Sequence, residues 1–361
     1  MNSPKKKLTG VITYILTISI ALELLSRLIL GSPFGRDLMW RLALSGARCD
    51  SSSRIIWIYQ HSSIRKNSRY NPNYKYIVHN ASRGYAIKPG LTDAAYFGDK
   101  TLSANSRGLR GKIEYQYAKP PEKKRIVVLG DSFTFGEEVS DEETYPYYLQ
   151  QLLPLSEVIN FGVTGYAHDQ MLIYLKEEGI KYGPDIVILG FTDCDINRNI
   201  LAFRDYAKPR FFLHNGKMVL KGCPIPSPED IIKEEPYRSK FLDLVNIAYQ
   251  SLRWKSGLNQ KEAKDITAAI LDEMVKTIKS AGAIPLFVHL PTGTDISDPR
   301  EKKFLFNYCE ARGILYLSIH PYFYSRIQKG ANLKTDNHWS SQEHRIAAEA
   351  IKAYLIKKGI F

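Results

Sequence analysis

The sequence is poor in cysteine, with four in 361 residues, and their spacing fits no metal-binding template. They are Cys49, Cys194, Cys223 and Cys309, and the sequence indicates no pairing among them. It also contains no internal repeat, no low-complexity segment and no zinc-finger or RNA-binding signature. We therefore expect neither a bound metal nor a nucleic-acid partner.

The balance of charge is strongly basic, with a formal net charge of +13. Such an excess suits nucleic acid, a membrane surface or an acidic polymer. Lys and Arg are scattered along the chain, however, and their clearest cluster is Lys5-Lys6-Lys7. A hydrophobic content of 44% supports a sizeable core, and the length allows about two domain-sized units.

An apolar run over residues 8–30 follows these three lysines. At about 1.5 Å per residue in a helix, it is long enough to cross a bilayer. Glu23 and Arg27 interrupt it one turn apart, where they can form a pair. The lysines predict a cytoplasmic N-terminus and an exported remainder. A cleaved signal peptide is the alternative, but no clear cleavage site follows the run, so we expect residues 1–31 to be a retained anchor.

Residues 32–122 are predicted to form an extension or cap region, with strand-like runs at 55–59 and 75–78 and a turn over 105–111. Residues 123–361 alternate between strand and helix patterns, apart from an insertion at about 198–260. Within the insertion, Asn215-Gly216 predicts a hairpin over 211–220. The expected strands are 126–129, 158–161, 186–189, 284–289 and 314–318, and the expected helices are 145–153, 169–181, 262–281, 302–311 and 341–358.

This alternation predicts an α/β fold, a parallel sheet covered by helices on both faces. Ligands of such sheets bind at the carboxyl ends of the strands. Ser132 lies there, in the sequence Gly130-Asp131-Ser132. A serine at a strand-to-helix turn exposes its hydroxyl and brings a backbone N–H close to a developing oxyanion. The plain alternative is that Ser132 only caps a helix.

A serine nucleophile needs a base, and the base needs an orienting group. Asp336 and His338 offer both within the sequence Asp336-Asn337-His338-Trp339, just before the last predicted helix. We therefore predict an acyl-transferring site made of Ser132, His338 and Asp336. His338 should lie within hydrogen-bond reach of Ser132. His168 is expected to line or support the pocket.

These motifs resemble the GDSL/SGNH hydrolase superfamily, over roughly residue 123 to the C-terminus. The resemblance implies a three-layer α/β/α flavodoxin-like domain, a nucleophile at Ser132 and no cofactor. It also implies that Gly165, at the end of the segment 158–165, donates a backbone N–H to the oxyanion. The Asp-x-His-Trp form resembles the SGNH-like domains of polysaccharide O-acetylation systems.

The third motif departs from the superfamily pattern. In the register we assign, Cys194 stands where an oxyanion-binding Asn is usual, and Asp195 stands at the motif Asp. A thiol is a weaker hydrogen-bond donor than an amide. Asn197 or Asn199 could supply the missing donor instead, or Cys194 could be a packed thiol without a part in the chemistry.

The expected activity is hydrolysis of an O-acyl or acetyl ester on cell-surface carbohydrate or lipid, in the periplasm or at the cell surface. An O-acetyltransferase acting on a cell-envelope polysaccharide is one alternative, because the acyl-enzyme is shared and only the acceptor differs. A non-catalytic carbohydrate-binding protein on the same scaffold is the other. The sequence indicates neither the natural substrate nor the oligomeric state.

Overall fold

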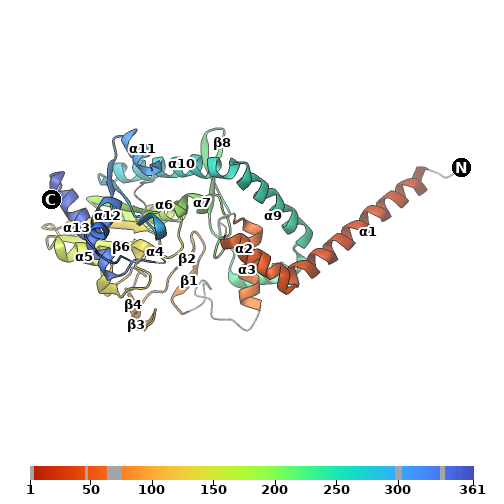
Figure 1. The fold of residues 1–361 in the computed structure, drawn as a ribbon, viewed down its shortest axis with the longest axis horizontal. Coiled ribbons are helices and arrows are strands. Elements are labelled where there is room, and N and C mark those ends of the chain that lie inside the picture. The colour runs from red at the N-terminus through yellow and green to blue at the C-terminus, as the bar shows by residue number, and fades with distance from the viewer. Residues whose placement is uncertain (1–3, 45–47, 63–74, 297–302, 334–337) are drawn as a thin grey trace.

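Five of the expected strands form one parallel sheet (Figure 1). The structure is a computed structural model that describes residues 4–44, 48–62, 75–296, 303–333 and 338–361. The sheet order is β11-β10-β7-β5-β6, and every neighbouring pair is parallel. The strands are β5 (Lys124–Gly130), β6 (Ser156–Gly162), β7 (Ile186–Phe191), β10 (Ile284–His289) and β11 (Leu315–Ser318).

Four side chains of β5, which lies between β7 and β6, alternate between two cores and are fully buried. Ile126 and Val128 join one hydrophobic cluster, and Val127 and Leu129 join the other. A strand buried on both faces reads as a continuous apolar run, which is why the sequence pattern identified it. One face is covered by α5 (Tyr145–Leu152), α12 (His320–Gln328) and α13 (Ser341–Lys357), and the other by α6 (His168–Glu177), α10 (Leu258–Ser280) and α11 (Phe304–Glu310). The predicted three-layer α/β/α architecture is confirmed.

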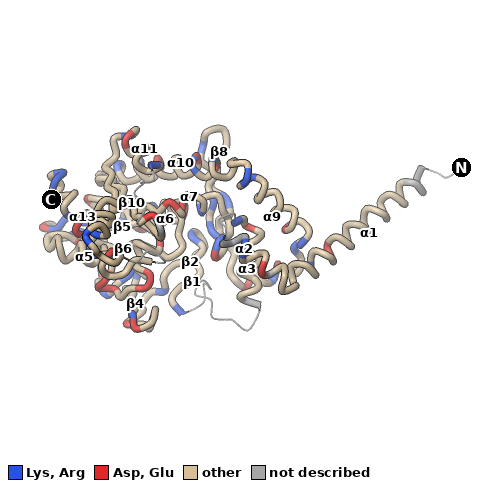
Figure 2. Tube along the Cα trace, in the orientation of Figure 1, with Lys and Arg blue, Asp and Glu red and all other residues tan. Residues whose placement is uncertain are grey.

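Three helices precede this sheet. They are α1 (Pro4–Gly31), α2 (Pro33–Leu44) and α3 (Asp50–Ser62). The segment Leu8–Gly31 of α1 is long and apolar enough to span a membrane, and it projects from the rest of the chain (Figure 1). Its only charged residues are Glu23 and Arg27, whereas Lys and Arg are spread over the remainder (Figure 2). This helix is a candidate membrane anchor or signal sequence.

The strand expected over residues 55–59 is wrong, because this segment lies inside α3. The β-branched residues Ile55 and Ile56 favour a strand locally. The helix is instead fixed by tertiary contacts, since Trp57 is buried against Phe203 and Tyr206. Its other buried positions are mostly serines, so the helical period is invisible to a reading of hydrophobicity alone.

The extension forms two hairpins that lie against the loops of the sheet. They are β1 (Ile77–Asn80) with β2 (Gly84–Ile87), and β3 (Leu91–Ala95) with β4 (Thr101–Ala104). Tyr85 donates its hydroxyl to the Thr164 carbonyl at 2.8 Å, and Gln170 donates to the Arg83 carbonyl at 2.8 Å. The extension is thus hydrogen-bonded directly to the loop that follows β6.

The insertion begins after α7 (Cys194–Arg198) and contains the predicted hairpin. Asn215 and Gly216 have φ of 50° and 72°, as a type I′ turn requires. Two helices that were not predicted follow the hairpin and pack against α1 and α3 rather than against the sheet. The remaining elements are β8 (Arg210–His214), β9 (Lys217–Lys221), α8 (Pro228–Glu234), α9 (Lys240–Lys255), α4 (Ser132–Phe135) and the short 3-10 helices η1 (Asp141–Glu143), η2 (Gly179–Tyr182), η3 (Glu235–Tyr237) and η4 (Gly293–Ile296).

All four cysteines lie among the described residues, and none of them forms a disulfide. Cys49 and Cys309 are buried, whereas Cys194 and Cys223 are exposed.

Arg110, at the end of the extension, binds the turn that follows Ser132. Its guanidinium donates to the carbonyls of Phe135 at 2.7 Å, Gly136 at 2.5 Å and Val139 at 2.6 Å, and to Asp141 at 3.0 Å. The side chain is 1% exposed. This single buried cation therefore links the extension to the turn that carries Ser132.

Replacing this cation should destabilise the fold. We expect Arg110→Met to cost about 3–5 kcal/mol, because it leaves three carbonyls and the buried Asp141 carboxylate without their donor. Lys112→Met is the matched control, since Lys112 pairs with Asp93 at an exposed position and should matter little. Urea unfolding followed by tryptophan fluorescence measures both variants. Equal losses of stability would contradict a special role for Arg110.

Candidate active site

The loops that follow β5, β6 and β7 meet at one edge of the sheet. Strand β5 lies between β6 and β7. The chain therefore places β6 on one side of β5 and the later strands, starting with β7, on the other side. The crevice at such a switch point is where open parallel sheets bind ligands. Ser132 follows β5, Gly165 follows β6 and Cys194 follows β7. The topology therefore brings all three predicted motifs to one place.

The turn at Ser132 depends on the residues just before it. A Cβ atom at Gly130 would overlap the side chain of Thr134, so glycine is needed here to let the first turn of α4 pack against the end of β5. The Asp131 carboxylate accepts a hydrogen bond from the Phe133 backbone N–H at 3.0 Å and caps the first turn of α4. Asp131, and not Ser132, is therefore the capping residue, which leaves the hydroxyl of Ser132 available.

His338 contacts this hydroxyl as predicted, with 2.9 Å between its Nε2 and the Ser132 Oγ. The adjacent Trp339 holds the loop in place. Its ring is fully buried against Phe133 and Phe323, and its Nε1 donates to the Pro291 carbonyl at 3.1 Å. The tryptophan of the motif thus acts as a core anchor that fixes the position of the neighbouring imidazole.

Two carboxylates that were not predicted lie beside this imidazole. Glu138 Oε1 is 3.4 Å from His338 Nδ1, and Glu137 Oε2 is 4.0 Å from His338 Nε2. Glu138 has φ of 70°, a strained conformation for a residue with a side chain. The predicted orienting residue, Asp336, lies outside the described residues. The sequence shows this acidic pair directly after the Ser132 turn, but not that its side chains approach His338.

The loop after β6 is held tightly at Gly165, which has φ of 81°. A Cβ atom there would lie 2.6 Å from the Tyr85 hydroxyl, so the extension and the loop approach each other too closely for a side chain. His168 is fully buried and bonds Asn199 at 3.0 Å, so of the two roles that we expected it has the supporting one and does not line the pocket. Burial lowers the pKa of His168 to about 3, so it supports the loop as a neutral ring.

The third motif lies beside Asp131. Thr192 hydrogen-bonds both the Asp131 carboxylate and the Cys194 thiol at 3.2 Å. Cys194 and Asn197 are exposed. Asn199 is fully buried, and its amide nitrogen contacts His168 and donates to Thr267 at 2.7 Å. The Asn199 amide is therefore engaged in packing α7 against α10.

Asp131, Cys194 and Asp195 each place a potential metal-ligand atom within 4.8 Å of the others. The guanidinium of Arg198 already lies between the two carboxylates, 3.2 Å from Asp131 and in direct contact with Asp195. Burial and the neighbouring Asp131 raise the pKa of Asp195, while Arg198 opposes this shift. An arginine does not lose its proton in proteins, so Arg198 is the cation of this cluster.

Comparison with solved structures finds esterases and lipases. A GDSL-like lipase from Bacteroides thetaiotaomicron is 14% identical, with a TM-score of 0.37 over 67% of this chain and 92% of its own. A member of the lipolytic protein G-D-S-L family from Veillonella parvula is 11% identical, with a TM-score of 0.37 over 65% and 97%. An acetyl xylan esterase is 11% identical, with a TM-score of 0.39 over 63% and 98%.

No protein-family model and no curated protein matches the sequence.

His344 supports the His338 loop and should make the stability of the fold depend on pH. Its Nδ1 accepts a hydrogen bond from the Tyr145 N–H at 3.1 Å, and burial lowers its pKa to about 3. In the unfolded chain the ring takes up a proton below about pH 6.5. Between the two pKa values the unfolded state binds more protons, so the free energy of unfolding decreases as the pH falls.

The test compares the wild type with His344→Asn, whose carbonyl oxygen can still accept from Tyr145. From about pH 6.5 to about pH 5, the wild type should lose about 2 kcal/mol more stability than the variant, at about 1.4 kcal/mol per pH unit. Urea unfolding across this range measures the difference. Parallel curves for the two proteins would show that His344 does not titrate on unfolding.

Proposed function

We propose that this protein is a serine ester hydrolase of the SGNH type. One observation carries the proposal: the Ser132 hydroxyl and the His338 imidazole, 206 residues apart, meet at 2.9 Å at the carboxyl end of a central parallel strand. A hydroxyl and a base at hydrogen-bond distance form the minimal unit for nucleophilic acyl transfer. Among the described residues, His168, His289 and His344 are bonded elsewhere, and His338 is the histidine that contacts Ser132.

In the proposed reaction the Ser132 oxygen attacks the ester carbonyl while His338 Nε2 accepts the hydroxyl proton. The tetrahedral intermediate collapses to an acyl-serine, and His338 returns the proton to the leaving alcohol. Water then attacks the acyl-serine with His338 again as the base, which releases the acid and restores the serine. A negative group near Nδ1 of His338 stabilises the imidazolium that forms in each half of the reaction. We assign this part to Asp336, with Glu138 as a second carboxylate.

The oxyanion of each intermediate needs donors that are already in position. We propose the backbone N–H groups of Ser132 and Gly165 for this role. Cys194 lies close to Asp131, the residue just before Ser132, and is the candidate for a third, weaker hydrogen-bond donor. Asn197 remains the alternative on α7, since the Asn199 amide is occupied by its contacts with His168 and Thr267.

The substrate we propose is an O-acyl or acetyl ester on carbohydrate or lipid outside the cytoplasm. The apolar helix Leu8–Gly31 supports a membrane-anchored protein, and Lys5 to Lys7 support a cytoplasmic N-terminus. An O-acetyltransferase would use the same acyl-serine and pass the acyl group to a sugar hydroxyl. A binding protein without activity would need no contact between Ser132 and His338.

Replacing the nucleophile should separate these functions. Ser132→Ala should abolish turnover of p-nitrophenyl acetate and labelling by a fluorophosphonate, because no other group accepts the acyl unit. The measurement is made on the full chain with and without an acetylatable polysaccharide. Acyl transfer to the polysaccharide would identify a transferase. If the wild type neither hydrolyses the ester nor reacts with the fluorophosphonate, only the binding function remains.

The two candidate orienting carboxylates should differ in their effects on kcat. We expect Asp336→Asn to lower kcat by about 10³–10⁴-fold, as loss of the orienting group does in a serine triad. Glu138→Gln should lower it by only about tenfold, since its contact with Nδ1 is long at 3.4 Å. Glu142→Gln, at an exposed position nearby, is the control and should have no effect. The opposite order of effects would assign the orienting role to Glu138.

A further inference from the structure

The exposed face of α9 is entirely apolar. Between Phe241 and Arg253, every exposed residue of this helix is hydrophobic, and the spacing of these residues places them on one stripe. Several are more than half exposed, including Leu242 at 62%, Tyr249 at 53% and Leu252 at 65%. The full stripe comprises Leu242, Val245, Ala248, Tyr249 and Leu252. A helix that faces water normally presents polar residues at these positions.

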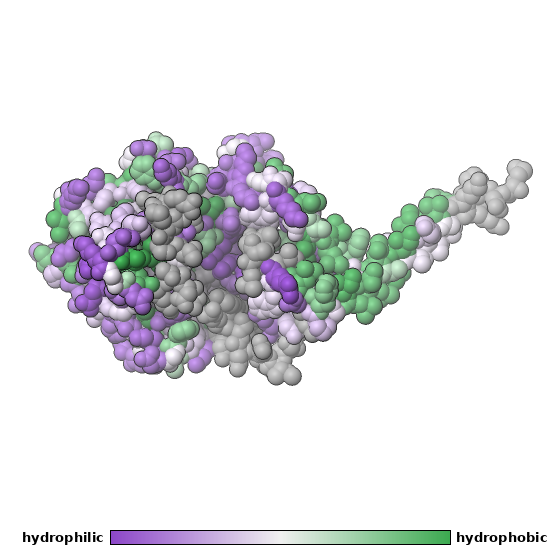
Figure 3. All heavy atoms as spheres, in the orientation of Figure 1, coloured by the Kyte–Doolittle hydropathy of each residue, from purple (hydrophilic) through white to green (hydrophobic). Residues whose placement is uncertain are grey.

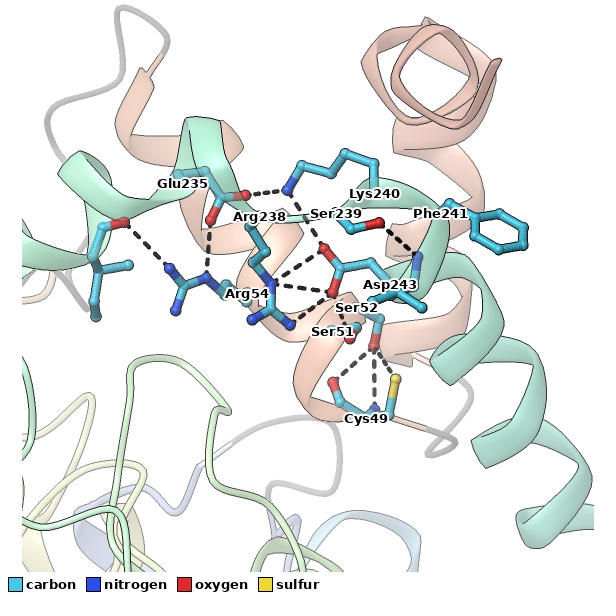
Figure 4. A network of polar contacts seen from close by, with 12 residues as sticks. Cys49, Ser51, Ser52, Arg54, Glu235, Arg238, Ser239, Lys240, Phe241 and Asp243 are labelled. Atoms are coloured by element: carbon cyan, nitrogen blue, oxygen red, sulfur yellow. Dashed lines mark hydrogen bonds and ion pairs between the residues drawn. The ribbon is translucent and has the colours of Figure 1, made fainter. Parts of the chain in front are cut away.

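The opposite face of α9 meets the protein through both polar and apolar side chains. Asp243 is 2% exposed and accepts hydrogen bonds from Ser51 of α3 at 2.8 Å and from Arg238 at 2.7 Å (Figure 4). Nearby, Glu235 pairs with Arg54 at 2.9 Å and contacts Lys240. Beside these ion pairs, Leu244 and Ile247 of the same face pack in an apolar cluster with Leu30, so α9 is apolar on its outward stripe and also on part of its inward face. Such a helix fits an apolar surrounding better than water.

The start of α9 is attached to α1 within the apolar span. Glu23 of α1 accepts from the Ser239 hydroxyl at 2.8 Å and from the backbone N–H groups of Lys240 at 3.0 Å and Phe241 at 3.1 Å. Glu23 lies 15 residues beyond Leu8, about 22 Å along a helix. This distance is shorter than the roughly 30 Å hydrocarbon thickness of a bilayer. If α1 spans a membrane from Leu8, the first turn of α9 lies at the depth of the outer leaflet.

Helix α9 then runs from the end of α1 toward α10 instead of alongside α1 (Figure 1). Apolar surface continues from α1 onto this region (Figure 3). Aromatic side chains are exposed around the junction: Tyr237 at 90%, Phe34 at 71% and Trp40 at 38%. Aromatic residues concentrate at the boundary between lipid and water.

A cavity of about 530 Å³ opens at the same junction. Its walls include Leu30, Ile55, Ile58 and Ile232, together with Arg27. The Arg27 guanidinium already pairs with Glu23 at 2.8 Å, and Glu235 and Lys240 also line the cavity, so it is the apolar walls that suit the hydrocarbon chain of a lipid.

We propose that α9 lies in the outer-leaflet interface of the bilayer, with its apolar stripe among the acyl chains. This inference rests on the proposed membrane anchor but not on the proposed chemistry. The bilayer is the occupant because the stripe is continuous with a membrane-spanning helix and starts at membrane depth. A protein partner would require neither property.

Site-specific photo-crosslinking of the full-length protein tests this inference. We would place p-benzoylphenylalanine at Val245 or Leu252 and reconstitute each protein in vesicles of phosphatidylcholine and phosphatidylglycerol. Illumination should give lipid adducts, detected by mass, at both positions. Leu16 in α1 is the positive control. Leu155, 72% exposed on the turn between α5 and β6, is the matched negative control and should give none.

Adducts at Leu16 without adducts at Val245 or Leu252 would overturn the proposal while leaving the anchor intact. Adducts at none of these positions would reject the anchor and the proposal together. Crosslinks from the stripe to a protein in native membranes, without lipid adducts, would show that a partner subunit covers it. Fluorophosphonate labelling of Ser132, measured on the same samples, reports separately on the proposed chemistry.

Discussion

The parallel pairing of β5 with β6 on one side and β7 on the other is the constraint on which the site depends. Parallel strands point the same way, so the loops after all three emerge at one edge. The paired positions Gly130 and Gly162 place the ends of β5 and β6 level with each other. The strand order therefore brings together Ser132, Gly165 and Cys194, although these residues are far apart in the sequence. The His338 loop reaches this edge because Trp339 is buried in the core beneath it.

The extension completes the site by holding two of these loops. Arg110 binds the turn after Ser132, and Tyr85 binds the loop that carries Gly165. Neither loop is held by the sheet alone, because both lie beyond the last paired residues of their strands. A positioned nucleophile and an oxyanion donor need rigid support. The residues before the sheet are thus part of the machinery that sets the geometry of the site.

The sequence was sufficient for the sheet and for the contact between Ser132 and His338 but not for the surroundings of the site. The strands were predictable because β5 and β7 are buried on both faces and read as unbroken apolar runs. The contact of Ser132 with His338 followed from the chemistry that each requires. Glu138 could not be predicted, because its approach to His338 depends on an unusual backbone conformation at φ of 70°. The position of His168 was equally hidden, since its burial depends on packing between α6 and α7.

Helix α9 escaped prediction for a related reason, since apolar residues lie on both its outward and its inward face and the inward face also carries Asp243. A sequence prediction that expects apolar residues to face the core gives such a helix the wrong orientation or does not detect it. Its position also has a mechanical consequence. Helix α10 begins three residues after α9 ends, and its Thr267 is bonded to Asn199 at the end of α7. If α9 lies in the interface, this connection fixes the third motif relative to the bilayer, so the site would act on esters at a defined height above the membrane.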